Sequence, residues 1–198
     1  MSLDDPRRNI PAGLKTDEFL LRPILASDAA RDHEAVMETR VDLRVWEQSS
    51  WPEDDFTVEA NREDLANLEQ RHLERRAFTY TVLAPDETDC LGCVYVFPTT
   101  ATFLAKATVT PVAANPVWTE IDAVIYFWVR QSRIASDMDT RLLEAMRTWF
   151  DERWELTRTV FVTNQQFEHQ VRLLESARLH LQFELREPSK PGTYLVYG

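Results

Sequence analysis

The sequence predicts a mixed α/β (α+β) domain in which a mostly antiparallel sheet of about seven strands carries helices on both faces. Short apolar segments of strand length alternate with longer segments whose apolar residues recur at helical spacing. A strand, a helix and a second strand follow one another over residues 120–163, which implies one parallel crossover in a sheet otherwise built from neighbouring strands. The length of 198 residues suits one domain with a buried core.

The first sixteen residues contain two prolines and no periodicity, so we expect a flexible lead-in at residues 1–16 and a single domain over residues 17–198. A strand is expected at residues 18–24. Ser27 and Thr57 are natural N-cap residues, and each precedes a segment with helical spacing. The sequence therefore predicts two helices, over residues 27–44 and 57–76, with a polar loop between them.

A β-hairpin is predicted by two apolar segments, residues 77–84 and 90–98, separated by the turn sequence PDET. Residues 99–119 contain two prolines and show no clear pattern, so no regular structure is assigned to them. The remaining segments have strand or helix patterns. The expected strands are 120–130, 158–163, 180–187 and 192–198, and the expected helices are 137–154 and 164–179.

The charge balance argues against nucleic acid as a partner. Lys and Arg number 22 against 33 Asp and Glu, which gives a net charge of −11, so phosphates would meet mostly like charge. No segment approaches the roughly 20 apolar residues of a membrane-spanning helix, and the start of the chain does not resemble a secretion signal. We therefore expect a cytoplasmic protein that binds neither nucleic acid nor a membrane.

The two cysteines, Cys90 and Cys93, form one CLGC motif. It could be a redox pair or half of a zinc site. Two buried strand residues are the favoured interpretation, because residues three apart in a strand point to opposite faces and no second cysteine pair completes a tetrahedral site. We predict no metal site.

The order of these elements, together with four segments, resembles the GCN5-related N-acetyltransferases (GNAT). The segments are FLLRPILASDA, FTYTVLAPDETDCLGCVYVFP, FWVR before a helix, and VFVTNQQFEHQVRLLESARL. The resemblance implies transfer of an acetyl group from acetyl-CoA to an amine on a small molecule or a peptide. It also implies that the pantetheine arm of CoA lies between the strands AVIYFWV and TVFVT. The pyrophosphate would then bind N–H groups at the start of the following helix.

The turn before that helix lacks the glycines that resembling proteins usually carry in the pattern Gln/Arg-x-x-Gly-x-Gly/Ala. Aligning the downstream leucines with Leu142 and Leu143 places Asp137 and Asp139 at the glycine positions. Carboxylates there would repel a pyrophosphate, and Ser136 or Asp137 would cap the helix instead.

Several residues near this turn are candidates for binding the cofactor. Arg130 and Arg133 could bind phosphate in place of backbone donors, or could pair with the local aspartates. Asn164 resembles a polar residue that reaches the pantetheine amides, or it caps the following helix. The full set of cofactor-binding candidates is Trp128, Val129, Arg130, Arg133, Ser136 and Asn164.

The candidate catalytic residues are Glu120 and Asp122, carboxylates at the start of the strand 120–130 that could accept a proton from the amine. The alternative is a solvated strand end. In many resembling proteins a tyrosine on the last helix protonates the leaving thiolate and a glycine follows it. Leu174 and Arg178 occupy those positions here.

Residues 45–56 lie where resembling proteins build the acceptor pocket. This segment contains two tryptophans and three carboxylates, which favours a cationic amine, although the tryptophans could equally be packing anchors. These residues are Trp46, Trp51, Glu53, Asp54 and Asp55.

Two functions follow from these patterns. The first is an acetyl-CoA-dependent N-acetyltransferase. The second is a GNAT-like interaction or regulatory module that has lost CoA binding, and the missing glycines favour it. A homodimer is expected from the sheet edges near the C-terminus.

Overall fold

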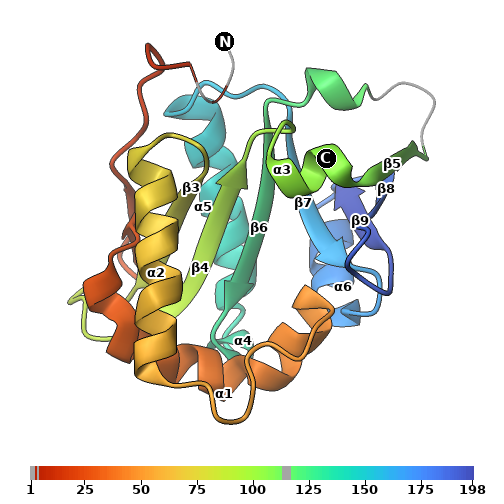
Figure 1. Cartoon of the computed structure of the whole chain (residues 1–198). Coiled ribbons are helices and arrows are strands. Elements are labelled where there is room, and N and C mark those ends of the chain that lie inside the picture. Colours follow the sequence, from red (N-terminus) through yellow and green to blue (C-terminus); the bar gives the residue numbers. More distant parts are fainter. Residues whose placement is uncertain (1–2, 4, 113–116) are drawn as a thin grey trace.

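A computed structural model describes residues 3, 5–112 and 117–198. Nine strands form one sheet in the order β1-β2-β3-β4-β6-β7-β9-β8-β5 (Figure 1). All neighbours are antiparallel except β6 and β7, which are parallel, as the crossover predicts. The strands are β1 (Leu14–Lys15), β2 (Leu20–Pro23), β3 (Phe78–Leu83), β4 (Cys90–Phe97), β5 (Thr108–Pro111), β6 (Ala123–Val129), β7 (Thr159–Asn164), β8 (Leu181–Arg186) and β9 (Tyr194–Tyr197).

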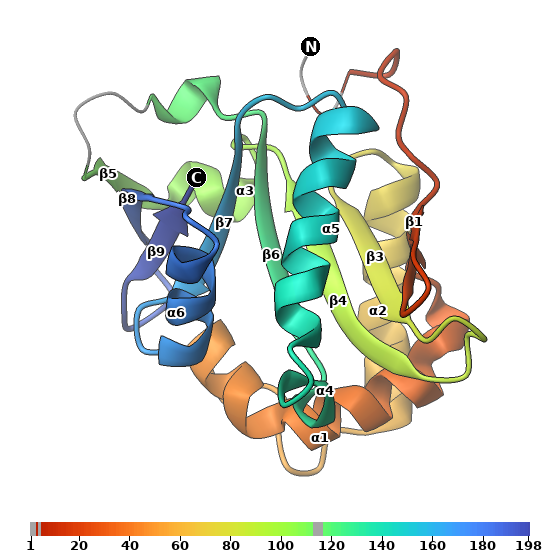
Figure 2. The same ribbon diagram turned by 180° about the vertical axis from the view of Figure 1, so that it is seen from behind.

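Helices cover both faces of the sheet, and each face has its own apolar cluster (Figures 1 and 2). One cluster joins α5 and α6 to the sheet, and the other joins α1, α2 and α3 to the opposite face. The helices are α1 (Ala29–Glu47), α2 (Val58–Leu73), α3 (Thr102–Lys106), α4 (Gln131–Ile134), α5 (Met138–Glu152) and α6 (Glu168–Ser176), with 3-10 turns η1 (Ala26–Asp28) and η2 (Trp118–Glu120).

The mixed, mostly antiparallel sheet is confirmed, but it has nine strands instead of the expected seven. The two additional strands are β1, in the expected lead-in, and β5, in the unassigned segment 99–119. β5 pairs with β8 although it contains mostly threonine and proline, so its extended conformation comes from a distant partner and not from its own pattern. Residues 113–116 of that segment lie outside the described residues.

The N-terminal segment contacts the body of the domain. Leu3 is 2% exposed, the Tyr80 hydroxyl donates to the Pro11 carbonyl at 2.8 Å, and Arg8 donates to the Trp154 carbonyl at 2.6 Å. The sheet therefore begins at Leu14, three residues before the expected start of the domain.

One of the two predicted helix caps is confirmed. Thr57 Oγ1 accepts from the Ala60 N–H at 3.1 Å and caps α2. Ser27 does not cap α1, because the chain enters through η1 and the buried Asp28 carboxylate accepts from the Leu25 N–H and from Arg22.

The cysteines share a face of the sheet, which corrects the expectation of opposite faces. A β-bulge in β4 beside Gly92 inserts one residue, so Cys90 and Cys93 both pack into the cluster under α1. Gly92 has φ +156°, and a Cβ there would lie 2.2 Å from the Trp128 carbonyl oxygen. The glycine of CLGC thus allows β4 to approach β6, and both cysteines are free thiols in the core.

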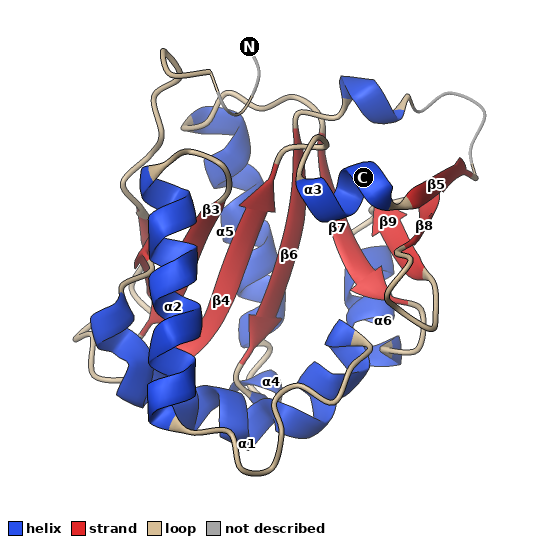
Figure 3. Ribbon diagram, in the orientation of Figure 1, coloured by secondary structure: helices blue, strands red, loops and turns tan. Residues whose placement is uncertain are grey.

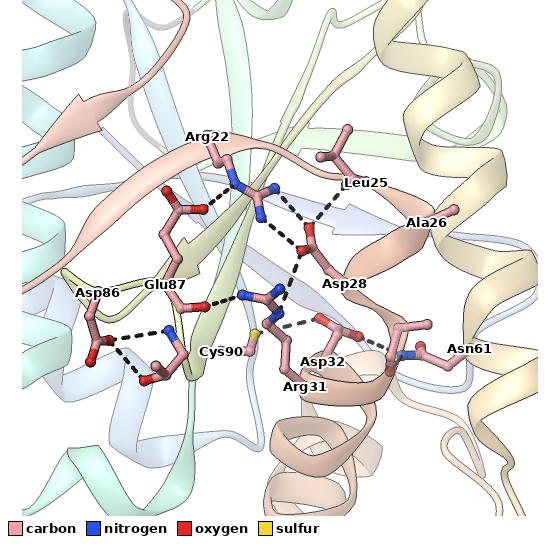
Figure 4. A network of polar contacts seen from close by, with 12 residues as sticks. Arg22, Leu25, Ala26, Asp28, Arg31, Asp32, Asn61, Asp86, Glu87 and Cys90 are labelled. Atoms are coloured by element: carbon pink, nitrogen blue, oxygen red, sulfur yellow. Dashed lines mark hydrogen bonds and ion pairs between the residues drawn. The ribbon is translucent and has the colours of Figure 1, made fainter.

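A buried carboxylate fixes the start of α1 against the sheet and α2 (Figure 4). Asp32 is 3% exposed and accepts from Asn61 Nδ2 at 2.9 Å and from Cys90 Sγ at 3.6 Å. Burial raises the pKa of Asp32 to about 6, although the hydrogen bonds from Asn61 and Cys90 oppose the rise. The charged form therefore destabilises the folded state.

Replacing this carboxylate with a neutral amide, Asp32→Asn, is expected to stabilise the folded protein relative to wild type, and the more so the higher the pH. The folded protein holds the proton up to pH 6 and the unfolded chain releases it near pH 4, so wild-type stability falls between these values. The free energy of unfolding of the variant, relative to wild type, should rise by about 3 kcal/mol between pH 4 and pH 7. Urea unfolding at both pH values measures it; an equal difference at the two values would contradict the account.

Candidate functional site

The two central strands separate part of the way along their length (Figure 3). Residues 123–125 of β6 pair with residues 159–161 of β7, and the pairing ends there. Beyond this point β6 pairs only with β4, while β7 pairs only with β9. The backbone groups of β6 that face β7 are therefore free of sheet partners over its last four residues.

A cavity of about 230 Å³, here called the gap cavity, lies at this separation. It is bounded by α1, by the end of β6, by the start of α5 and by α6. Trp128 and Val129, two of the predicted cofactor-binding residues, line it. Other lining residues are Trp46, Asp139, His169 and Gln170.

Gln170, which lines this cavity, has an unused hydrogen-bond acceptor. Its side chain is 4% exposed, and its Nε2 donates to the Phe127 carbonyl at 2.9 Å, which bridges α6 to the unpaired end of β6. Its Oε1 is buried and has no partner within the described residues, and the same holds for Trp46 Nε1. A buried acceptor and a buried donor without partners are uncommon, and both fit a ligand that carries amide groups.

The turn that follows β6 is attached to α1. Gln131 N–H donates to Thr39 Oγ1 at 3.0 Å, and Ser132 N–H donates to Glu38 Oε1 at 2.9 Å. Arg130 Nε donates to the same Glu38 carboxylate at 2.6 Å. Although burial acts to raise the pKa of Glu38, the hydrogen bonds from Ser132 and Arg130 hold it below its usual value. This part of the turn is therefore occupied by protein groups.

The arginines do not pair with the aspartates of the turn. Arg130 pairs with Glu38 on α1, and Arg133 lies 3.8 Å from Asp89. Ser136 donates from its hydroxyl to the Arg133 carbonyl at 2.8 Å and does not cap α5. Phosphate binding by these three residues stays a prediction; only Arg133 and Ser136 are largely exposed.

Asp139 belongs to the first turn of α5, and it lines the gap cavity. Its side chain is 6% exposed, and its carboxylate accepts from the Thr140 N–H at 2.9 Å and from His169 Nε2 at 2.6 Å. The carboxylate thus lies where the resemblance implies a pyrophosphate, and it takes one of the backbone donors of the helix start. Sequence spacing placed Asp139 here but missed His169, which lies thirty residues away on α6.

Asp137 occupies the N-cap position of α5 without a side-chain cap bond, and its backbone is left-handed, with φ 56° and ψ 28°. Arg178 is also left-handed, with φ 60°. These are two of the positions where resembling proteins carry glycine, so the backbone keeps a conformation that favours glycine. Leu174, at the position of the usual tyrosine, is fully buried in the core.

Glycine at position 137 is therefore expected to stabilise the protein. Asp137→Gly relieves the left-handed strain and should raise the free energy of unfolding by up to about 1 kcal/mol. The matched control is Ala135→Gly, at a right-handed and exposed residue, which should lower it by a similar amount. Thermal unfolding measures both variants, and a lower melting temperature for Asp137→Gly would oppose the argument.

Asn164 joins β7 to the end of α1. Its Nδ2 donates to the Val45 carbonyl, and its Oδ1 accepts from the Gln166 N–H at 3.1 Å. The side chain therefore closes the turn before α6 and holds α1, without capping α6 itself, where Phe167 is at the N-cap. Its contact with pantetheine stays a prediction, which these bonds do not favour.

Glu120 and Asp122 lie at the closed end of the gap, before the paired part of β6. Glu120 pairs with Arg158 and is half exposed. One oxygen of Asp122 accepts from Thr157 N–H, Thr157 Oγ1 and Arg158 N–H, at 2.9 to 3.2 Å. Both carboxylates thus fix the connection between α5 and β7, and their catalytic role stays a prediction without support from these contacts.

A second cavity, of about 490 Å³, lies on the face of the sheet covered by α1 and α2, and we call it the aromatic cavity. Trp46 lines both this cavity and the gap cavity, so the two meet at this residue. Trp51 lines it as well, and seven aromatic side chains contribute in all: Trp46, Trp51, Tyr95, Phe97, Phe103, Tyr126 and Tyr194.

The carboxylates of the aromatic cavity are not the expected ones. Asp54 pairs with Arg44 and is exposed, and the carboxylates of residues 53–55 do not line the cavity. Instead Asp64 comes from α2, Glu47 from α1, and Glu187 from the segment after β8. Burial raises the pKa of Glu187 from its ordinary value of 4.5, and Lys190 opposes the rise. A carboxylate from the far end of the chain could not be placed here by local sequence pattern.

None of the helices within the described residues has the length and apolar character needed to cross a membrane. The same residues contain no group of three or more His, Cys, Asp and Glu side chains arranged to hold a metal ion.

No protein-family model matches the chain, and no curated protein matches it. Solved structures do resemble it over nearly its whole length. A ribosomal-protein-S5-alanine acetyltransferase from Vibrio fischeri has 16% identity and a TM-score of 0.67, with 94% of this chain and 95% of that chain covered.

Two further structures were solved with ligands. A ribosomal L7/L12 α-N-protein acetyltransferase in complex with coenzyme A has 16% identity and a TM-score of 0.66, with 95% of each chain covered. A microcin C7 self-immunity acetyltransferase in complex with acetyl-CoA and AMP has 13% identity and a TM-score of 0.67, with 95% of this chain and 96% of that chain covered. The chain therefore has the GNAT fold, as the resemblance implies.

Proposed function

We propose that the protein is an N-acetyltransferase that uses acetyl-CoA and acts on an amine. The observation that carries this proposal is the gap cavity between the separated strands, in a fold shared with structures solved with CoA and acetyl-CoA. Two residues that line it, Gln170 and Trp46, each have a buried side-chain atom without a hydrogen-bond partner among the described residues. A pantetheine arm supplies both an amide N–H for the first atom and carbonyl oxygens for the second.

In this proposal the two cavities hold the two substrates. The arm occupies the gap cavity, the amine enters the aromatic cavity, and the thioester lies between them beside Trp46. Holding the nitrogen and the thioester carbon in one geometry supplies a large part of the acceleration.

Glu187 is the proposed general base in place of Glu120 and Asp122. It lines the aromatic cavity, it has no ion pair with the described residues, and burial makes it a stronger base than an ordinary carboxylate. Burial raises the pKa of the Tyr126 hydroxyl and the Glu187 carboxylate adds to that rise, which is consistent with a carboxylate that faces β6 where the strands separate.

In the proposed reaction Glu187 accepts the first proton. The ammonium gives one proton to the carboxylate, and the neutral nitrogen attacks the thioester carbon. The C–N bond forms, the C–S bond breaks, and the nitrogen loses its second proton while the CoA thiolate gains one. The products are an acetamide and free CoA thiol.

A second function is favoured by one specific observation: Asp139 occupies the start of α5 where the pyrophosphate would bind. On that account the chain is an interaction or regulatory module with a closed cofactor site.

An acetylation assay separates the two functions. The protein is incubated with acetyl-CoA and a panel of primary amines and peptides, and mass spectrometry and thiol release are followed together. The enzyme predicts a product that gains one acetyl group in proportion to thiol released. Thiol release and acetylation at the rates of a buffer blank, for every amine, would favour the module.

A further inference from the structure

The aromatic cavity continues into a third cavity of about 830 Å³, here called the basic cavity, so that the two form one groove. They share Arg71, Phe97, Phe103 and Glu187 as lining residues. The groove lies between α2 on one side and α3 with the segment after β8 on the other. Together the volumes exceed the roughly 300–1,000 Å³ of a small-molecule site, so the groove has the length for a chain-like ligand.

The two ends of the groove differ in charge. Aromatic rings line the end next to the gap cavity together with Glu47 and Asp64, while Glu187 and Arg71 line both cavities. Burial raises the pKa of Glu187. The far end is lined by Glu74 and by four cations: Arg71, Arg75, Arg76 and Lys106. The acidic and aromatic end suits an ammonium group, and the basic end suits carboxylates.

Two of these cations are available to a ligand. Arg76 pairs with Glu74, and Arg75 donates to the carbonyls of Asp5 and Arg8. Arg71 and Lys106 are exposed and make no ion pair or side-chain hydrogen bond with the described residues. They stand on opposite walls of the groove, on α2 and α3 respectively.

The groove is richer in cations than the chain as a whole. Five of its 22 Lys and Arg residues line the groove, but only four of its 33 Asp and Glu residues do so. In a protein of net charge −11, the groove is thus a locally basic surface that leads into an acidic, aromatic end.

The aromatic end also contains a donor without a partner. Tyr126 is 8% exposed, and its hydroxyl is buried with no hydrogen-bond partner within the described residues. Its ring is in edge contact with Trp46, Phe97 and Tyr194. A ligand with a carbonyl oxygen next to its ammonium group would supply the missing acceptor, and the first residue of a polypeptide has this arrangement.

From these observations we propose that the groove binds the free N-terminal segment of an acidic polypeptide. Its α-ammonium lies in the aromatic cavity near Glu187, its first carbonyl faces Tyr126, and carboxylates a few residues later lie against Arg71 and Lys106. The proposal deepens the acetyltransferase function and rests on it, because the α-amine is the group to be acetylated.

The test uses octapeptides with a free N-terminal serine and a C-terminal fluorophore. One peptide has Asp and Glu at positions 3–6, a second has Lys at these positions, and a third repeats the acidic sequence with an acetylated N-terminus. Acetylation is followed by mass spectrometry and binding by fluorescence anisotropy. The anisotropy measurement needs no acetyl-CoA, so it tests peptide binding even if the protein transfers no acetyl group.

We expect the acidic peptide to exceed the lysine peptide at least tenfold in kcat/KM and in affinity, and N-terminal acetylation to weaken its binding. The double variant Arg71→Glu/Lys106→Glu should remove or reverse this preference while its thermal unfolding stays unchanged. The matched control Arg172→Glu, at an exposed arginine of α6 outside the groove, should keep the preference.

The outcomes separate this proposal from the acetyltransferase function. Acetylation of small amines with equal or better use of the lysine peptide would overturn the groove proposal alone. Tight binding of the acidic peptide without any acetyl transfer would support the groove and overturn the acetyltransferase. Equal binding of all three peptides would overturn the groove proposal whatever the activity.

Discussion

Replacing Asp139 with alanine is expected to tighten acetyl-CoA binding about ten- to hundredfold. The Asp139 carboxylate accepts from the Thr140 N–H and lies in the gap cavity, where it competes with the pyrophosphate for the start of α5 and repels it. Two unit charges 4 Å apart repel by about 4 kcal/mol at an effective dielectric constant of 20, and salt reduces this value. Because about 1.4 kcal/mol corresponds to one decade, a gain of one to two decades follows. Isothermal titration calorimetry measures it.

Two companion variants isolate the cause. Asp139→Asn keeps an acceptor for Thr140 but removes the charge, so it should give a smaller gain, of about tenfold. Asp151→Ala removes an exposed carboxylate from the same helix outside the gap cavity, and it should leave the affinity unchanged. Unchanged affinity in Asp139→Ala, in a variant that keeps its thermal stability, would refute the idea that this carboxylate blocks the site.

Replacing Glu187 with glutamine is expected to lower kcat/KM by about 10²–10³. The change keeps the shape of the side chain but removes the proposed base, and general bases contribute about 10²–10⁴ to the rate. Glu184→Gln, three residues earlier on β8 and outside the cavities, is the matched control. Steady-state assays with one amine acceptor measure both variants.

Glu120→Gln and Asp122→Asn belong in the same experiment, because the sequence names these two residues as candidate bases. Their contacts with Arg158 and Thr157 predict lower thermal stability with nearly normal kcat/KM. A lower kcat/KM in either of these variants, together with a normal kcat/KM in Glu187→Gln, would show that the base is at the start of β6 and not Glu187.

The same base predicts a pH dependence. Glu187 must be deprotonated to accept a proton, and burial places its pKa above the ordinary value of 4.5. The limb of kcat/KM that falls toward acid pH should therefore have its midpoint above 4.5, and Glu187→Gln should abolish this limb. A midpoint at or below 4.5 would contradict the assignment.

Most of the fold follows from local pattern, because each core element carries its own periodicity. β3, β4, β7 and α5 lie where alternation or helical spacing predicts them. β5 was missed because its pairing with β8 is decided by a strand more than seventy residues away. The C-terminal end of α1 was expected at residue 44, three residues too early, because Trp46 resembles a loop residue. Only the packing of its ring against Tyr126 and Tyr95 shows that it belongs to the helix.

The candidate site was harder to predict than the fold. The alignment with resembling proteins placed Asp137 at a glycine position, and its left-handed backbone agrees with that placement. The residues that contact the turn after β6 and the start of α5 are distant in the sequence: Glu38 and Thr39 lie on α1, and His169 lies on α6. Gln170 was not distinguished from other polar helix residues, because its importance lies in one hydrogen bond to Phe127 and one oxygen without a partner.

Titration of the wild-type protein with acetyl-CoA tests the central claim most directly. If the gap cavity accepts the pantetheine arm while Asp139 competes with the pyrophosphate, calorimetry should show one saturable site of weak affinity, between about 0.1 and 1 mM. The melting temperature should rise with ligand concentration. No heat of binding and no change in melting temperature at several millimolar acetyl-CoA would contradict it.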